Sequence, residues 1–209
     1  MTSSKPPGLY PEDVKLHSKR LTLRTFRRSD LDVEDSWPDF TEPIYRHYNP
    51  LRDDGYSKDR RYLEGLNIFD LKLAILEGGI NVGYVGLYDS DARERSAWMG
   101  IQFAADQRSK GYCKESLTLL CDAFFHDWRM ERMSLEVAIF NLMGVRCYER
   151  VGFRMVRQFW HHRAYQRRLD YERDERLAPI RQHFRKGAMG VEVEYLEMIA
   201  TRETFDNRR

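Results

Sequence analysis

The sequence lacks the marks of several broad protein classes. Its longest mainly apolar stretch, residues 117–125, is far below the roughly 18–20 residues that a membrane-spanning helix needs. Residues 1–10 have no apolar core like that of a secretory signal peptide. Only three cysteines occur, Cys113, Cys121 and Cys147, and none forms a CxxC pair. These absences argue against a membrane protein, a disulfide framework and a zinc site, and they predict a cytoplasmic protein with free, mostly buried thiols.

An excess of charge of one sign is also missing. Lys and Arg number 35 against 33 Asp and Glu, a net charge of +2. The chain therefore has no global field of the kind that a general nucleic-acid-binding protein shows. With 209 residues, 42% of them apolar and 13% aromatic, it can bury a full core. We predict one domain over residues 13–205, a flexible proline-rich arm over 1–12 and a flexible tail over 206–209.

Period-two alternation and short apolar runs predict strands, whereas apolar residues at three-to-four spacing predict helices. The strands lie at 20–26, 72–79, 80–89, 98–104, 133–140, 153–160 and 191–200, and a Gly-Gly turn joins the second to the third. One helix begins near Ser29 or Asp30, a second covers 111–128, and a third covers 142–151 and ends at Gly152. The aromatic-rich residues 32–70 indicate further helical stretches without clear ends, and either a substrate wall or ordinary packing. The last strand alternates Val and Glu, which predicts pairing at or near a sheet edge. This order indicates a mixed α/β sheet.

Residues 106–116, DQRSKGYCKES, are the most informative part of the sequence. They lie between a predicted strand and a predicted helix, with Gly111 at the first turn of the helix. Unpaired amides and the positive end of the helix dipole make such a turn an anion site, and glycine permits the close approach of a phosphate. The segment matches neither GxxxxGKS/T nor GxGxxG, so a P-loop ATPase and a Rossmann dehydrogenase are disfavoured.

Two motifs resemble the GNAT superfamily of acyl-coenzyme A dependent N-acyltransferases. Arg108-Ser109-Lys110-Gly111-Tyr112-Cys113 resembles its signature Q/R-x-x-G-x-G/A, with Cys113 in place of the final small residue. Residues 141–153 resemble its pattern N-x-x-A-x-x-L-Y-x-x-x-G-F, with matches at Asn141, Tyr148, Gly152 and Phe153. The likeness covers residues 19–31, 72–160 and 191–205, and it is strongest to the branch that contains ribosomal-protein N-terminal, polyamine and amino-sugar acetyltransferases.

The resemblance implies a mixed, mostly antiparallel twisted sheet flanked by helices, with residues 161–190 as a charged helical insertion before the last strand. It also implies an N-acetyltransferase that uses acetyl-CoA as co-substrate and no metal, and that moves the acyl group to a primary amine by direct attack. The main chain near Ile101 and Phe103 would bind the pantetheine arm. Asn141 would contact the pantetheine or a water, and Tyr148 would give a proton to the leaving sulfur. The pyrophosphate would be held by Arg108, Ser109, Lys110, Gly111, Tyr112 and Cys113.

The position of the general base departs from the family pattern. Many relatives carry a glutamate just before Ile-Gly on the corresponding strand, but here Trp98 precedes Met99-Gly100, and an indole cannot accept a proton. Glu136, on the next predicted strand, is the nearest carboxylate and the candidate base. A water relay is one alternative, and the acidic residues of the 32–54 region are another: Glu34, Asp35, Asp39 and Glu42.

Residues 161–190 carry eight Lys and Arg against four Asp and Glu. One interpretation is a solvated face with i,i+4 pairs, such as Arg168 with Glu172. The other is a basic surface for an acidic acceptor, such as a nucleotide-linked sugar, a carrier protein or a tRNA end, or for an aminoacyl-tRNA donor. We expect a small-molecule amine as acceptor. A non-catalytic coenzyme A-binding module is compatible with Trp98 and disfavoured by Asn141 and Tyr148, and a homodimer stays open.

Overall fold

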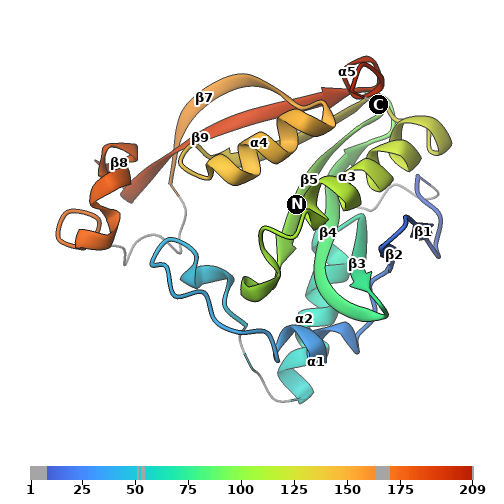
Figure 1. The fold of residues 1–209 in the computed structure, drawn as a ribbon, viewed down its shortest axis with the longest axis horizontal. Helices are drawn as coiled ribbons and strands as arrows, with labels where there is room; N and C mark the ends of the chain where they lie inside the picture. Colours follow the sequence, from blue (N-terminus) through green and yellow to red (C-terminus); the bar gives the residue numbers. More distant parts are fainter. Residues whose placement is uncertain (1–8, 51, 53–54, 163–169, 209) are drawn as a thin grey trace.

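The computed structural model describes residues 9–50, 52, 55–162 and 170–208, and one twisted sheet runs through it (Figure 1). Along the sheet the order of strands is β1-β2-β3-β4-β5-β6-β9-β7, and β8 pairs with β9 beside the end of β6. All neighbours are antiparallel except β5 and β6, which are parallel. The strands are β1 (Lys15–His17), β2 (Leu21–Thr25), β3 (Leu71–Glu77), β4 (Ile80–Asp91), β5 (Ser96–Phe103), β6 (Arg132–Ala138), β7 (Arg154–His162), β8 (Phe184–Gly187) and β9 (Gly190–Thr201).

Helices cover both faces of the sheet. They are α1 (Asp30–Glu34), α2 (Gly55–Ile68), α3 (Tyr112–Asp122), α4 (Leu142–Val151) and α5 (Arg202–Asp206), with 3₁₀ helices at Arg46–Tyr48, Ala105–Gln107 and Glu175–His183. Successive side chains of a strand point to opposite sides of the sheet, so alternate residues of β3 pack against the helices on the two faces. Leu73 and Ile75 pack in the main core with Leu117 of α3, whereas Ala74 packs with Leu31 of α1.

The feature of the sheet that positions the site is the separation of β5 from β6. The two strands pair only at three positions, where Ser96, Ala97 and Trp98 lie beside Arg132, Met133 and Ser134. After Trp98 on β5 and Ser134 on β6, no residue of one strand pairs with the other strand, so the remaining parts of the two strands diverge. A strand edge without a neighbour leaves main-chain groups available to a ligand.

The fold class and most of the predicted elements are confirmed. The Gly78-Gly79 turn joins β3 to β4 with φ of 56° and 87°, and Gly152 ends α4 with φ of 118°. Helix α3 is shorter than predicted, because a π-helical turn follows it at Ala123–Asp127. Helix α2 lies within residues 32–70, where the sequence indicates helical stretches without fixing their ends. Three elements were not predicted: β1, β8 and α5.

The C-terminal third follows its predictions in part. Strand β9 lies near an edge of the sheet, as predicted, with only β7 outside it. Its glutamates are accommodated because neighbouring strands and turns supply basic partners: Arg157 to Glu197 at 2.7 Å, His183 to Glu194 at 2.7 Å and Arg185 to Glu192 at 2.6 Å. The described part of the predicted 161–190 insertion holds a 3₁₀ helix and the strand β8, and residues 163–169 lie outside the described residues.

The predicted flexible ends are only partly within the described chain. Residues 1–8 and Arg209 lie outside it. Tyr10 packs edge-on against Trp128, with ring centroids 5.2 Å apart, and its hydroxyl is 2.9 Å from Ser90 Oγ. Asp206 belongs to α5. The chain is therefore held against the core at Tyr10 and at Asp206.

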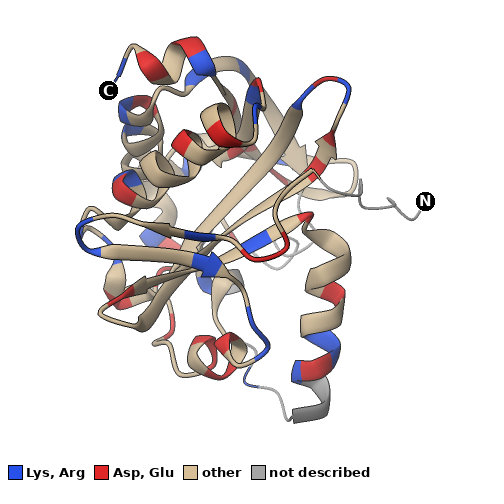
Figure 2. Ribbon diagram, turned by 90° about the vertical axis from the view of Figure 1, so that its right-hand side faces the viewer, with Lys and Arg blue, Asp and Glu red and all other residues tan. Residues whose placement is uncertain are grey.

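Charged residues of both signs are interspersed over the helices and strands (Figure 2). This distribution agrees with the net charge of +2. Within the part of the chain that the structure describes, no helix has the length and apolarity to cross a membrane.

Candidate active site

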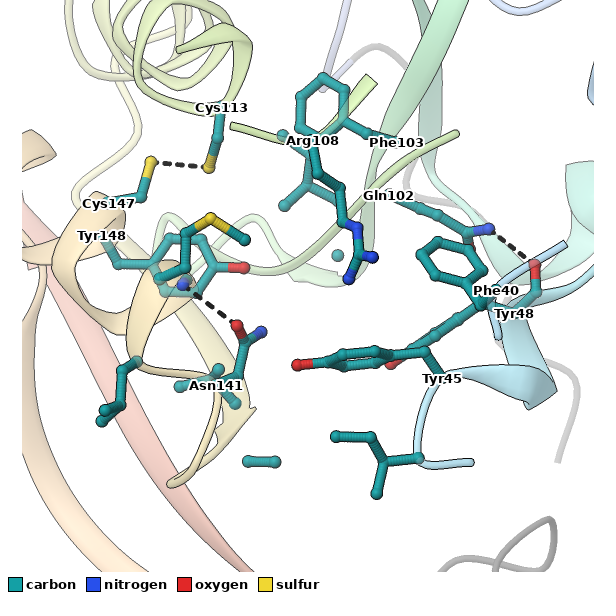
Figure 3. A pocket seen from close by; sticks show the side chains of 18 of the residues that line it. Phe40, Tyr45, Tyr48, Gln102, Phe103, Arg108, Cys113, Asn141, Cys147 and Tyr148 are labelled. Atoms are coloured by element: carbon teal, nitrogen blue, oxygen red, sulfur yellow. Dashed lines mark hydrogen bonds between the residues drawn. The ribbon is translucent and has the colours of Figure 1, made fainter. Parts of the chain in front are cut away.

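A cavity of about 1550 Å³ lies where β5 and β6 diverge (Figure 3). Its two walls are the unpaired ends of these strands, Met99 to Phe103 on β5 and Leu135 to Ala138 on β6. The start of α3, the first two turns of α4 and the aromatic segment 40–48 also line it. Ile101 and Phe103, the residues predicted to bind the pantetheine arm, both lie on the β5 wall.

The start of α3 forms one end of the cavity. Gly111 is the N-cap residue, with a left-handed φ of 83°, and no side chain caps the helix. A left-handed backbone here favours glycine, and an uncapped helix start presents amides to an anion. Residues 109–114 line the cavity together with cations that add positive charge: Lys110, Lys114, Arg146 and Arg150.

Arg108 lines the cavity but is turned away from the start of α3. Its Nη2 is 2.7 Å from Glu42 Oε1, and this hydrogen bond lowers the pKa of the Glu42 carboxyl. Its guanidinium also lies 5.1 Å from the ring centroid of Phe40 and 5.4 Å from that of Tyr45 (Figure 3). Such contacts between a guanidinium and aromatic faces are favourable. Arg108 therefore joins the α3 loop to the 40–48 segment.

Helix α4 brings Asn141 and Tyr148 to the cavity. The Asn141 Oδ1 accepts a hydrogen bond from the Gly144 amide at 3.1 Å and so caps the helix, which leaves its Nδ2 as the group available to a ligand. The Tyr148 ring packs edge-on against Phe153, and its hydroxyl points into the cavity (Figure 3). Burial, with a smaller contribution from Cys113 and Cys147, raises the pKa of Tyr148 well above its usual value. The phenol is therefore a neutral proton donor at physiological pH.

Among the acids considered for the role of base, Glu136 is the one that lines the cavity. Its Oε2 is 3.6 Å from Nδ1 of His161 on β7. Trp98 is the last residue of β5 that pairs with β6, and it does not line the cavity. The four alternatives lie outside the lining, and each contacts a cation: Glu34 contacts Lys72, Asp35 contacts Lys58 and Arg61, Asp39 contacts Arg52, and Glu42 contacts Arg108.

The wall opposite Tyr148 is aromatic and was only partly foreseen. The aromatic composition of residues 32–70 indicated a substrate wall or ordinary packing, and three of these residues line the cavity: Phe40, Tyr45 and Tyr48. Phe140, Phe184 and Tyr195 were missed, because they come from three separate places in the sequence (the turn after β6, strand β8 and strand β9), and only the fold packs them together. The described part of the 161–190 segment adds Asp170, Asp174 and Arg176 to the lining, and Asp174 is ion-paired to Arg176 at 2.6 Å.

Comparisons with solved structures place this fold among acetyltransferases. A chimera of the spermidine N-acetyltransferase SpeG of Vibrio cholerae and hSSAT superposes with a TM-score of 0.64 at 20% identity, covering 91% of this chain and 100% of that chain. An acetyltransferase (GNAT family) of Bacillus anthracis superposes with a TM-score of 0.64 at 14% identity, covering 91% of this chain and 99% of that one. At these identities the likeness concerns the fold alone.

Sequence comparisons identify the family. The SPbeta prophage-derived N-acetyltransferase YokL of Bacillus subtilis (strain 168) is 25% identical over 138 residues, which is 65% of this chain and 76% of that protein. The acetyltransferase (GNAT) domain family matches residues 20–154, well over half of the chain and the part that contains the α3 loop, β5, β6 and α4. The chain therefore belongs to the GNAT acetyltransferase family and is an N-acetyltransferase.

Proposed function

We propose that this chain transfers an acetyl group from acetyl-CoA to a primary amine by direct attack of the amine. One continuous cavity carries the proposal, because it joins the uncapped start of α3 to the Tyr148 hydroxyl and to the aromatic wall at 40–48. An anionic nucleotide, an extended arm and an acceptor amine would thus share one space. The residues present fit the co-substrate: a left-handed Gly111, neighbouring cations and the unpaired edge of β5.

In this proposal, the amides and side chains from Ser109 to Cys113 hold the pyrophosphate, with Lys110 and Lys114 adding charge. Arg108 would join them only by leaving Glu42. The β5 main chain near Ile101 and Phe103 holds the pantetheine arm, and Asn141 Nδ2 contacts the arm or a water. Bound acetyl-CoA supplies the activated acetyl thioester. Tyr148 Oη donates a proton to the leaving sulfur, which a phenol that stays neutral can do.

We assign the acceptance of the amine proton to Glu136. An amine must be neutral to attack, so a carboxylate on the cavity wall has a direct role, either by itself or through one water. The Nδ1 of His161 lies 3.6 Å from the Glu136 carboxylate and would orient it. His161 would also take on the proton that the carboxylate accepts from the amine. This assignment replaces the glutamate that many relatives carry at the position of Trp98.

For the acceptor we propose a small amine that carries positive charge or an apolar body. The aromatic wall favours either, since aromatic faces attract cations and bury apolar groups. The described part of the 161–190 segment adds Asp170 and the Asp174–Arg176 ion pair to the lining, and these three groups carry no excess of positive charge that would attract an acidic acceptor such as a tRNA end. The SpeG relatives are named as spermidine N-acetyltransferases, which agrees with a cationic acceptor. We propose the cytoplasm as the location of this reaction.

The test is a two-step assay with the purified full chain. Calorimetry measures acetyl-CoA binding, and thiol release is then followed with polyamines, aromatic amines, amino sugars and amino-terminal peptides. We expect acetyl-CoA to bind more tightly than an adenine nucleotide that lacks the pantetheine, and thiol release to depend on one class of amine. Salt screens every attraction between exposed charges. The KM of a cationic amine held by carboxylates should therefore rise with salt, and the KM of an amine held by its apolar body should change little. Absence of acetyl-CoA binding would refute the proposal.

A further inference from the structure

Two of the three free cysteines meet at the boundary between α3 and α4. The sulfur atoms of Cys113 and Cys147 are hydrogen-bonded 2.7 Å apart, and the side chains point at each other (Figure 3). Cys113 lies in the first turn of α3, and Cys147 directly precedes Tyr148 on α4. Both are half-buried and both line the cavity, whereas Cys121 is fully buried in the core.

This geometry suits the formation of a covalent bond. A disulfide has an S–S distance of about 2.05 Å, so the two sulfurs need to approach by less than about 1 Å. The hydrogen bond with Cys113, and then the charges of Arg150 and Lys114, lower the pKa of the Cys147 thiol. The hydrogen bond with Cys147, together with burial, raises the pKa of the Cys113 thiol. Cys147 is thus the thiol that ionises more readily and attacks first.

We propose that Cys113 and Cys147 are a site of oxidative modification, forming a reversible disulfide that weakens the binding of coenzyme A at the start of α3. The effect on binding rests on the proposed function, whereas the formation of the disulfide does not. In the cytoplasm such a bond is transient and regulatory rather than structural.

The oxidation balances with hydrogen peroxide as the oxidant. The Cys147 sulfur attacks one peroxide oxygen and breaks the O–O bond, which gives a sulfenic acid and one water. The Cys113 sulfur then attacks the sulfenic sulfur, forms the S–S bond and releases the second water. The two thiols lose two electrons and two protons in total, and the peroxide is reduced. A small dithiol reverses the change by thiol–disulfide exchange.

The disulfide would connect the start of α3, which we assign to the pyrophosphate, to α4, which carries Tyr148. Cys113 follows Gly111 by two residues, so movement of its sulfur toward α4 moves the amides that we assign to the pyrophosphate. Binding and oxidation are then linked: coenzyme A must favour the dithiol by the same factor by which the disulfide weakens coenzyme A binding. A tenfold weakening corresponds to a rise of about 30 mV in the reduction potential of the pair when coenzyme A saturates both forms.

The experiment is a redox titration of the full chain in dithiothreitol buffers, with and without coenzyme A. After peroxide we expect three thiols to fall to one, a mass loss of about 2 Da, and one cross-linked peptide pair containing Cys113 and Cys147. Saturating coenzyme A should raise the midpoint potential by about 30 mV, for a tenfold change in affinity. Cys147→Ser should abolish the loss of two thiols. The control Cys121→Ala removes the third thiol and should keep both the loss of two thiols and the shift in midpoint potential.

The possible failures are distinguishable. The disulfide would be overturned if all three thiols persist after peroxide. It would also be overturned if the Cys147→Ser variant still loses two thiols. A midpoint potential that does not respond to coenzyme A, in a protein whose reduced form binds it, would overturn the coupling. If the reduced protein does not bind coenzyme A at all, the proposed function fails, while the thiol count still decides whether the disulfide forms.

Discussion

Removal of a single oxygen atom, by Tyr148→Phe, separates binding from proton transfer at this site. The ring remains packed against Phe153, so the affinity for acetyl-CoA should stay within about twofold. The hydroxyl makes no hydrogen bond within the described residues, so its loss leaves no partner unpaired and should not lower the free energy of unfolding. A positioned proton donor contributes about 10²–10⁴ in rate. We therefore expect kcat to fall about a hundredfold or more.

The pH dependence gives a second, independent readout of the same residue. Burial first, and then Cys113 and Cys147, raise the pKa of Tyr148 well above 10, so the phenol stays protonated as the pH rises to 10. The kcat of the wild type should therefore show no loss on the alkaline side below that pH.

The matched control is Tyr10→Phe. Tyr10 is also half-buried, but it lies outside the cavity, and its hydroxyl is hydrogen-bonded to Ser90 at 2.9 Å. This variant should lose about 1 kcal/mol of stability and keep its kcat. Calorimetry, urea denaturation and steady-state thiol release measure the three quantities. A Tyr148→Phe enzyme with the wild-type kcat would show that another group protonates the sulfur.

Further expected outcomes concern the base and the end of α4. Glu136→Gln should lower kcat about a hundredfold or more in a thiol-release assay. The control Glu194→Gln, which removes a carboxylate outside the cavity, should not lower kcat. Equal effects of the two variants would show that Glu136 does not accept the amine proton. His161→Gln should alter the pH profile of kcat and leave the KM for acetyl-CoA unchanged, as initial rates across pH would show. Gly152→Ala should cost about 2–5 kcal/mol in urea denaturation, because φ is 118° and the new Cβ would lie 2.7 Å from a backbone oxygen. Gly65→Ala, on α2 with open space around it, should instead stabilise by about 0.5–1 kcal/mol, and similar losses in both would contradict the steric argument.

Local signals account for the part of the fold that the sequence could predict. The strands 72–79 and 80–89 carry a turn between them that only glycine adopts readily, and both glycines have positive φ. The end of α4 follows from Gly152 in the same way. The order of strands is a matter of long-range pairing, for which neighbouring residues hold no signal. The alternating glutamates of β9 indicated a strand at or near an edge, and the basic partners that accommodate them come from β7 and from residues 183–185, separate from β7 in the sequence.

The candidate site divides in the same way. The α3 loop and the Asn141–Phe153 segment are short motifs, so their residues could be named from the sequence, and the structure brings both to one cavity. The direction of Arg108 could not be predicted, because it depends on Glu42 and two aromatic rings from a segment some sixty residues earlier. The closeness of Cys113 and Cys147 likewise depends on the packing of α3 against α4, which no spacing in the sequence indicates.

The geometry of the diverging strands explains how a GNAT domain can function with Trp98 in place of a glutamate. Trp98 is paired on both sides, with Tyr88 on β4 and Ser134 on β6, so its position lies in the closed part of the sheet. Two residues further along, β5 reaches Gly100 and β6 reaches Glu136, the first titratable side chain on either wall. A side chain at Gly100 would meet only Tyr88, at 3.8 Å, so the absence of one leaves the space across from Glu136 open. In the proposed reaction an acceptor amine would approach Glu136 from the β5 side. The proton-accepting carboxylate would then lie on the β6 wall of the opening and not at the paired position of Trp98 on β5.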